Sequence, residues 1–142
     1  MLKLTDAIAT LPAQDIKRAR QFYEQKLGLV PTTEEADGGV RYKAGNSVFL
    51  VFPSRGKASG DHTQLGVDVD DINAAVTELK GNGVKIEEYD YPDFKTKGGI
   101  VEMPDGSKGA WFKDSEGNLI AVNQMARTAA GASSTGGQST SR

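Results

Sequence analysis

Acidic and aromatic residues are concentrated in one short stretch of the chain, residues 87–94. The stretch reads Glu-Glu-Tyr-Asp-Tyr-Pro-Asp-Phe, so four acids and three aromatic residues lie within eight positions. Aromatic ring faces attract cations by about 0.5 to 2 kcal/mol each, and a carboxylate fixes the charge. The composition therefore indicates a surface for a cationic, partly planar ligand, with Tyr91 and Phe94 as contacts. The alternative interpretation is a solvated strand end and loop, whose acids keep the chain soluble and whose aromatic residues cover a helix.

Groups that could carry out covalent or acid–base chemistry are few. The chain has no cysteine and a single histidine, His62, which excludes thiolate nucleophiles, disulfides and Cys-based zinc sites. No Ser-His-Asp set has suitable spacing, and the glycine pairs are typical of turns or bulges rather than of phosphate-binding loops. An enzyme with an unconventional site would have to use His62, Asp68 or Glu102 as its acid or base.

The overall charge argues against two classes of partner. The 142 residues include 19 acids and 17 bases, for a net charge of -2. Such a chain has no positive electrostatic field that would attract nucleic acid or an anionic membrane. It also has no run of about 18 apolar residues, and its N-terminus lacks the apolar core of a signal peptide. We therefore expect a cytoplasmic protein with neither a nucleic-acid nor a membrane partner.

An internal repeat organises the elements that must position these groups. The pattern Asp15-Ile16-x-x-Ala19 returns 56 residues later as Asp71-Ile72-x-x-Ala75. Each aspartate follows an extended apolar run and is a good N-cap for a helix. Apolar residues at helical spacing follow it, and a glycine marks the end of each predicted helix. Because 142 residues make about one domain, the repeat predicts two half-domains that share one fold.

Each half is predicted to contain one strand, one helix and about three further strands. We expect a single domain over residues 1–127, with a first module over about 1–53, a linker over 54–61 and a second module over about 62–127. Residues 128–142 consist almost entirely of Ala, Gly, Ser, Thr and Gln and are expected to be a disordered tail, native or added. The predicted strands are 2–11 (ended by Pro12), 40–43, 47–52, 64–69, 84–89, 99–103, 108–113 and 118–124, and the predicted helices begin at Asp15 and Asp71.

The chain resembles the vicinal oxygen chelate superfamily, which groups glyoxalases, bleomycin-resistance proteins and extradiol dioxygenases. The resemblance implies an α+β fold of two tandem βαβββ modules, with helices outside a cupped mixed sheet that holds the ligand, and often a homodimer. It rests on three stretches: Asp15-Ile16-x-x-Ala19-x-x-Phe22-Tyr23-x-x-x-Leu27-Gly28-Leu29, Val69-Asp70-Asp71-Ile72-x-Ala74-Ala75-Val76-x-x-Leu79, and Phe112-x-Asp114-x-x-Gly117-Asn118-Leu119-Ile120.

The resemblance also locates the positions at which enzymes of the family hold one divalent metal. These positions fall on Ile8 and Gln64 in the first strands of the modules, and on Phe49 and Ala121 in the last strands. A metal needs lone pairs from imidazole, carboxylate or amide groups, and three of the four residues offer none. We therefore expect no metal and no cofactor, with a set of His62, Gln64 and a displaced acid as the alternative.

The leading hypothesis is a metal-independent, homodimeric small-molecule-binding protein of the drug-sequestering, antibiotic-resistance kind found among bleomycin-resistance proteins. Its ligand would be apolar or aromatic, and residues 87–94 suit a cationic one. The alternatives are a glyoxalase-like or dioxygenase-like lyase, isomerase or oxidoreductase, and a structural module whose cup is filled. Whether Trp111 or Phe112 faces the cup stays open. The predicted contact residues are Ile8, Phe49, Gln64, Asp68, Tyr91, Phe94, Glu102, Trp111 and Ala121.

Overall fold

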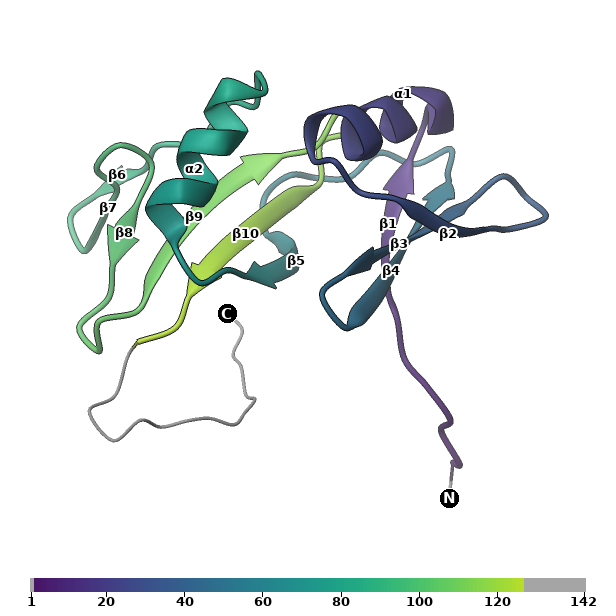
Figure 1. Ribbon diagram of the computed structural model, residues 1–142, viewed down its shortest axis with the longest axis horizontal. Helices are drawn as coiled ribbons and strands as arrows, with labels where there is room; N and C mark the ends of the chain where they lie inside the picture. Colours follow the sequence, from purple (N-terminus) through teal and green to yellow (C-terminus); the bar gives the residue numbers. More distant parts are fainter. Residues whose placement is uncertain (1, 127–142) are drawn as a thin grey trace. The chain divides into compact units, whose positions relative to one another are not determined.

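The computed structural model describes residues 2–126, which form two compact units (Figure 1). Among the described residues, the first unit holds residues 2–60 and 114–118, and the second holds residues 61–113 and 119–126. The first unit thus includes a short loop, residues 114–118, that lies within the predicted second module. The predicted tail, residues 128–142, lies outside the described residues.

The first unit is a four-stranded sheet with one helical segment on one face. The strands run in the order β1-β4-β3-β2, with β1 parallel to β4 and the other pairs antiparallel. Tyr23 fixes the helical segment to the sheet, because its ring lies 5.4 Å from that of Tyr42 and 5.6 Å from that of Phe49. The elements are β1 (Ala9–Ala13), α1 (Ile16–Gln21), the π-helical turn η1 (Phe22–Lys26), β2 (Pro31–Glu34), β3 (Val40–Ala44) and β4 (Ser47–Pro53).

The second unit repeats this plan and adds a small hairpin. Its main sheet has the order β5-β10-β9-β8, with β5 parallel to β10, and β6 pairs only with β7. Helix α2 lies along one face of β9 and β10 (Figure 1). The elements are β5 (Thr63–Asp68), α2 (Ile72–Gly81), β6 (Asp90–Tyr91), β7 (Phe94–Lys95), β8 (Val101–Glu102), β9 (Lys108–Lys113) and β10 (Leu119–Gln124).

The two halves of the repeat have the same local geometry at the start of their helices. Asp15 accepts a hydrogen bond from the backbone N–H of Arg18 at 3.0 Å, and Asp71 accepts one from Ala74 at 3.1 Å. Both aspartates are in the extended conformation of an N-cap residue. Two four-stranded mixed sheets, each with a helix on one face, confirm the predicted α+β class.

Several observed elements differ from the predicted ones, and β2 is a strand that was not predicted. The first strand begins at Ala9 and includes Pro12, which the sheet tolerates because β1 is an edge strand and needs no second ladder. Residues 84–89 form no strand and contribute only a single bridge from Ile86 to Phe112. The acidic and aromatic stretch instead contains the β6–β7 hairpin.

No helix within residues 2–126 is both long and apolar enough to cross a membrane.

Candidate functional site

The sheet of the second unit has one face against α2 and a second face that carries Trp111. The side chain of Gln124 accepts a hydrogen bond from the backbone N–H of Ile72, the first residue of α2, at 2.8 Å, so the even-numbered residues of β10 face the helix. Ile120 lies on that face and pairs with Phe112, while Ala121 pairs with Trp111. Phe112 therefore faces α2 and Trp111 lies on the opposite face, hereafter the Trp111 face.

Four rings form an aromatic cluster on the Trp111 face: Tyr89, Tyr91, Phe94 and Trp111. The indole of Trp111 makes edge contacts with Tyr89 at 5.8 Å and with Phe94 at 5.4 Å, and Tyr91 stacks on Tyr89 at 6.2 Å. The indole N–H also donates to Oγ1 of Thr63 at 3.2 Å. Tyr91 is 56% exposed and the other three rings are half-buried, so ring surface remains available to a ligand.

The four acids of the stretch belong to the same part of the chain as the aromatic cluster. The backbone N–H of Glu87 donates to the carbonyl oxygen of Trp111 at 2.8 Å, which joins the start of the stretch to β9. Asp90 lies 3.9 Å from the ammonium group of Lys95, with both side chains exposed, a pair that contributes little in water. Burial, and then the carboxylate of Glu87, raises the pKa of Tyr89. The Tyr89 hydroxyl therefore stays protonated at neutral pH.

Several of the predicted contact residues come together in the second unit. Tyr91, Phe94 and Trp111 belong to the aromatic cluster, and Ala121 is the cross-strand partner of Trp111, with 1% of its surface exposed. Gln64 is the extra residue of a β-bulge, because Thr63 pairs with Leu119 while Leu65 pairs with Ile120. Its Oε1 atom is buried and has no hydrogen-bond partner among the described residues.

Asp68 is exposed near the end of β5 and pairs with Asn123 of β10. Because Asn123 is an odd-numbered residue of β10, the register places Asp68 on the Trp111 face. Glu102, in contrast, pairs with Lys108, the residue before Gly109. It therefore lies on the face opposite Trp111 and apart from the aromatic cluster.

Phe49 does not lie on an open face of the first sheet. It is 3% exposed and packs against Tyr23 of the helical segment, so the predicted register is off by one residue. A shift of one residue moves a side chain to the other face of a sheet. Ile8 is half-buried before β1 and lines, with Thr33 and Arg41 among others, a hollow of about 400 Å³ in the first unit.

The residues at the four family metal positions do not fit a divalent ion. Ile8, Phe49 and Ala121 have no lone pairs to offer, and the amide oxygen of Gln64 is a single weak ligand. Within residues 2–126 no group of three His, Cys, Asp or Glu side chains is placed to hold a metal.

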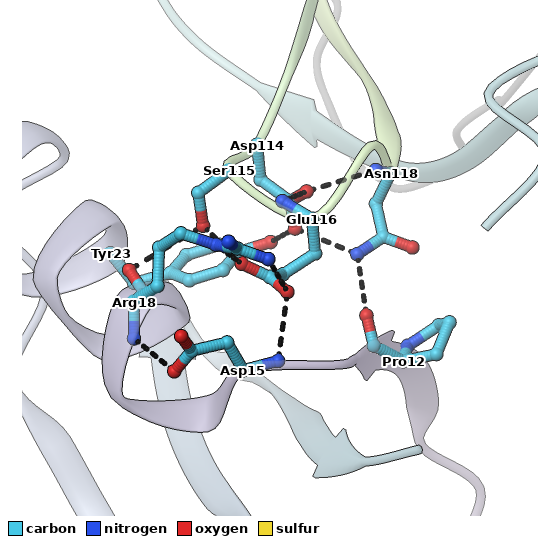
Figure 2. Close-up of polar contacts among 8 residues, drawn as sticks. All are labelled: Pro12, Asp15, Arg18, Tyr23, Asp114, Ser115, Glu116 and Asn118. Atoms are coloured by element: carbon cyan, nitrogen blue, oxygen red, sulfur yellow. Dashed lines mark hydrogen bonds and ion pairs between the residues drawn. The ribbon is translucent and has the colours of Figure 1, made fainter. Parts of the chain in front are cut away.

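A buried polar network in the first unit was not predicted from the sequence, although Tyr23, Asp114 and Asn118 belong to the stretches that carry the family resemblance. Asp114, 6% exposed, accepts hydrogen bonds from the Tyr23 hydroxyl, from the backbone N–H groups of Glu116 and Asn118, and from the Asn118 amide at 2.7 Å (Figure 2). The Asn118 amide also donates to the carbonyl oxygen of Pro12 at 3.0 Å. Only the folded loop brings these groups together, and their burial indicates a structural role.

Glu116 links the same loop to the start of α1 and makes the first unit sensitive to acid. Its carboxylate accepts from the Arg18 guanidinium at 2.8 and 3.0 Å and from the backbone N–H of Asp15 at 3.1 Å. Burial alone would raise the pKa of Glu116, but the hydrogen bonds from Arg18, Ser115 and Asp15 outweigh it and lower the pKa from 4.5.

Because the folded-state pKa of Glu116 is lowered, its contribution to stability is complete above pH 4.5 and is lost as pH falls through the lowered value. We expect Glu116→Gln to reduce the free energy of unfolding at neutral pH and to make its decline below pH 4.5 shallower. Urea titrations of both proteins over a series of pH values measure this. Parallel pH profiles would contradict the assignment.

Comparison with known proteins gives a consistent result for most of the chain. A sequence model of the glyoxalase/bleomycin resistance protein/dioxygenase superfamily matches residues 6–122. No protein of curated function matches the sequence.

Solved structures with the same fold include a lactoylglutathione lyase from Agrobacterium tumefaciens. It is 22% identical, with a TM-score of 0.62 over 86% of this chain and 96% of that one. A glyoxalase family protein from Bacillus anthracis is 18% identical, with a TM-score of 0.63 over 87% of this chain and 98% of that one. An integron cassette protein from V. cholerae is 20% identical, with a TM-score of 0.58 over 87% and 98% of the two chains.

Proposed function

Since the chain belongs to the glyoxalase/bleomycin resistance protein/dioxygenase superfamily, we propose that it is a member that binds a small aromatic cation at the aromatic cluster. The observation that carries the proposal is the cluster itself, in which Tyr89, Tyr91, Phe94 and Trp111 contact one another and keep part of their surface exposed. Binding of this kind would suit sequestration of a cationic drug, the role expected from the resemblance to bleomycin-resistance proteins.

The chemistry around the rings supports a cation rather than an anion. Residues 87–94 supply four carboxylates and no base, and the nearest bases in the sequence are Lys85 and Lys95. Ring faces add attraction for a cation, at about 0.5 to 2 kcal/mol for each favourable contact. A ligand with a flat apolar body and a positive charge would use both features at once.

Trp111 is the one tryptophan of the chain, so its fluorescence reports directly on the proposed site. We expect phenyltrimethylammonium to change the emission saturably, and its neutral isostere tert-butylbenzene to bind about tenfold more weakly, which corresponds to about 1.4 kcal/mol. Neutralising the four acids with Glu87→Gln, Glu88→Gln, Asp90→Asn and Asp93→Asn together should remove most of this difference.

The matched control is Glu78→Gln, because Glu78 is an exposed acid on α2, the helix that covers the other face of the same sheet. This variant should keep the affinity of wild-type protein for phenyltrimethylammonium. The proposal fails if the cation and its neutral isostere bind equally, or if neither changes the emission of Trp111.

A further inference from the structure

The hollow of about 400 Å³ in the first unit is separate from the aromatic cluster, because all of its lining residues lie between positions 6 and 48. They come from the segment before β1, from β2, from β3 and from the turn that leads into β4. Since β1 runs parallel to β4, with Ala9 opposite Phe49, the segment before β1 lies beside the start of β4. The volume is within the range of sites that bind small molecules.

Arg41 lies on the face of this sheet that is opposite to the helical segment. Its neighbours in β3, Val40 and Tyr42, are completely buried, and Tyr42 stacks on Tyr23 of the helical segment. Side chains alternate along a strand, so Arg41 projects from the other face. Thr33 pairs with Arg41 across β2 and β3 and therefore lies on the same face. Both residues line the hollow.

Glu35 fixes the Arg41 guanidinium but uses only one of its nitrogen atoms. Nε of Arg41 donates to Oε2 of Glu35 at 2.8 Å, and the two terminal nitrogens, Nη1 and Nη2, have no hydrogen-bond partner within residues 2–126. The Arg41 side chain is 40% exposed, so a ligand can reach these nitrogens. Their N–H groups lie on one edge of a planar group, which matches the two oxygen atoms of a carboxylate.

The charges around the hollow are balanced. Lys43 lies on the same face as Arg41 and pairs with Val48, another lining residue. Asp6 also lines the hollow, and its carboxylate accepts from the next backbone N–H at 2.8 Å. Two bases are therefore accompanied by two acids, Asp6 and Glu35. This balance gives no excess of positive charge for a dianion such as phosphate, whereas a monoanion needs only the free edge of one guanidinium.

We propose that this hollow is a second small-molecule site, which binds a polyhydroxylated monocarboxylate through Arg41. The carboxylate would accept hydrogen bonds from Nη1 and Nη2 of Arg41. The hydroxyl groups of the ligand would bind the hydroxyl and amide groups of three further lining residues, Thr33, Asn46 and Ser47. The inference does not depend on the proposed function, because the residues of the aromatic cluster all belong to the second unit.

Gluconate and sorbitol are matched probes for this site. Both are six-carbon chains that carry hydroxyl groups, but only gluconate has a carboxylate. We expect wild-type protein to bind gluconate about tenfold more tightly than sorbitol. Titrations followed by ¹H–¹⁵N NMR measure both affinities, and the signals that shift should be those of residues 6–8, 32, 33, 41 and 46–48.

Arg41→Gln tests the role of the guanidinium, because it removes the charge and keeps a side-chain amide. In this variant the ratio of gluconate affinity to sorbitol affinity should fall to about one. The matched control is Arg20→Gln. Arg20 is also paired with glutamates in the first unit, at 2.8 and 2.9 Å, but does not line the hollow, so its loss should leave the ratio unchanged.

Glu35→Gln should act in the opposite direction, which a purely structural ion pair would not do. The glutamine keeps an acceptor for Nε of Arg41 and removes the negative charge that competes with the ligand. Gluconate affinity should therefore rise, by about threefold, while sorbitol affinity stays the same. The control Glu34→Gln neutralises the adjacent acid, whose partner is Arg20, and should change neither affinity.

Three results would overturn this inference. They are equal affinities of wild-type protein for gluconate and sorbitol, absence of binding by both probes, and an affinity ratio in Arg41→Gln that equals that of the wild type. Each would leave the proposed function in place, because phenyltrimethylammonium binding at Trp111 is measured separately. Failure of the aromatic-cation site would likewise leave the gluconate results unaffected.

Discussion

Asp114→Ala is expected to lower the free energy of unfolding by about 3 to 5 kcal/mol, because it removes one charged acceptor from several buried donors at once. The carboxylate accepts from the Tyr23 hydroxyl, from two backbone N–H groups and from the Asn118 amide. Tyr23 is completely buried and stacks on Tyr42 under the helical segment. Loss of its partner therefore leaves a polar group unpaired inside the core of the first unit. Urea denaturation followed by circular dichroism measures the change.

Two further variants define the origin of this effect. Asp114→Asn keeps the volume and one acceptor oxygen and should lose about half as much stability as the alanine variant. Asp70→Ala removes an exposed acid and should change stability by less than about 0.5 kcal/mol. An Asp114→Ala protein as stable as Asp70→Ala would show that the network contributes little to the folded state.

Gly99→Ala is expected to destabilise the second unit by about 3 kcal/mol, whereas Gly98→Ala, at the adjacent position, should cost about 1 kcal/mol. Both glycines have positive φ angles, +62° for Gly98 and +86° for Gly99, so both alanines are strained in the backbone. Only the alanine at position 99 also meets another residue. Its Cβ would overlap Cγ2 of Ile86 and lie 3.3 Å from Cβ of Ile86, while nothing lies within 4 Å at position 98. Thermal melts of the two variants measure the difference.

The contribution of the steric clash to the loss of stability in Gly99→Ala can be tested by truncating the Ile86 side chain. Ile86 is 7% exposed and bridges to Phe112, so Ile86→Ala alone should cost about 2 to 4 kcal/mol. In Ile86→Ala the additional cost of Gly99→Ala should fall to about the cost of Gly98→Ala. Fully additive losses in the double variant would mean that strain in the backbone, and not contact with Ile86, accounts for the result.

The Trp111 face and the buried network around Asp114 differ in what they offer to a ligand. Asp114 and Asn118 are almost completely buried. The partners of the Asp114 carboxylate and of the Asn118 side-chain nitrogen are protein groups, while Oδ1 of Asn118 is buried without a partner among the described residues. On the Trp111 face, the rings of the aromatic cluster keep part of their surface exposed. This contrast is why variants of the loop are expected to report on folding and variants of the Trp111 face on affinity.

Features set by neighbouring residues could be predicted from the sequence. The two N-caps at Asp15 and Asp71 and the hairpin at Gly45-Asn46 depend on groups only a few positions apart. The apolar spacing after each cap likewise indicated which helix residues are buried, such as Ala19, Ile72 and Val76. The order of these local signals along the chain was sufficient to indicate the family and the α+β class.

Tertiary structure alone decided which side chains share a face. The family resemblance placed Phe49 on the wrong face, because an error of one residue in a strand reverses the direction of its side chain. Trp111 and Phe112 could not be told apart until pairing with β10 and the contact between Gln124 and α2 fixed the register. Trp111 and its cross-strand partner Ala121 are ten positions apart, and only pairing between β9 and β10 brings them together. The sequence by itself therefore determined the elements and the family, while the composition of the candidate site depended on long-range strand pairing that local spacing does not encode.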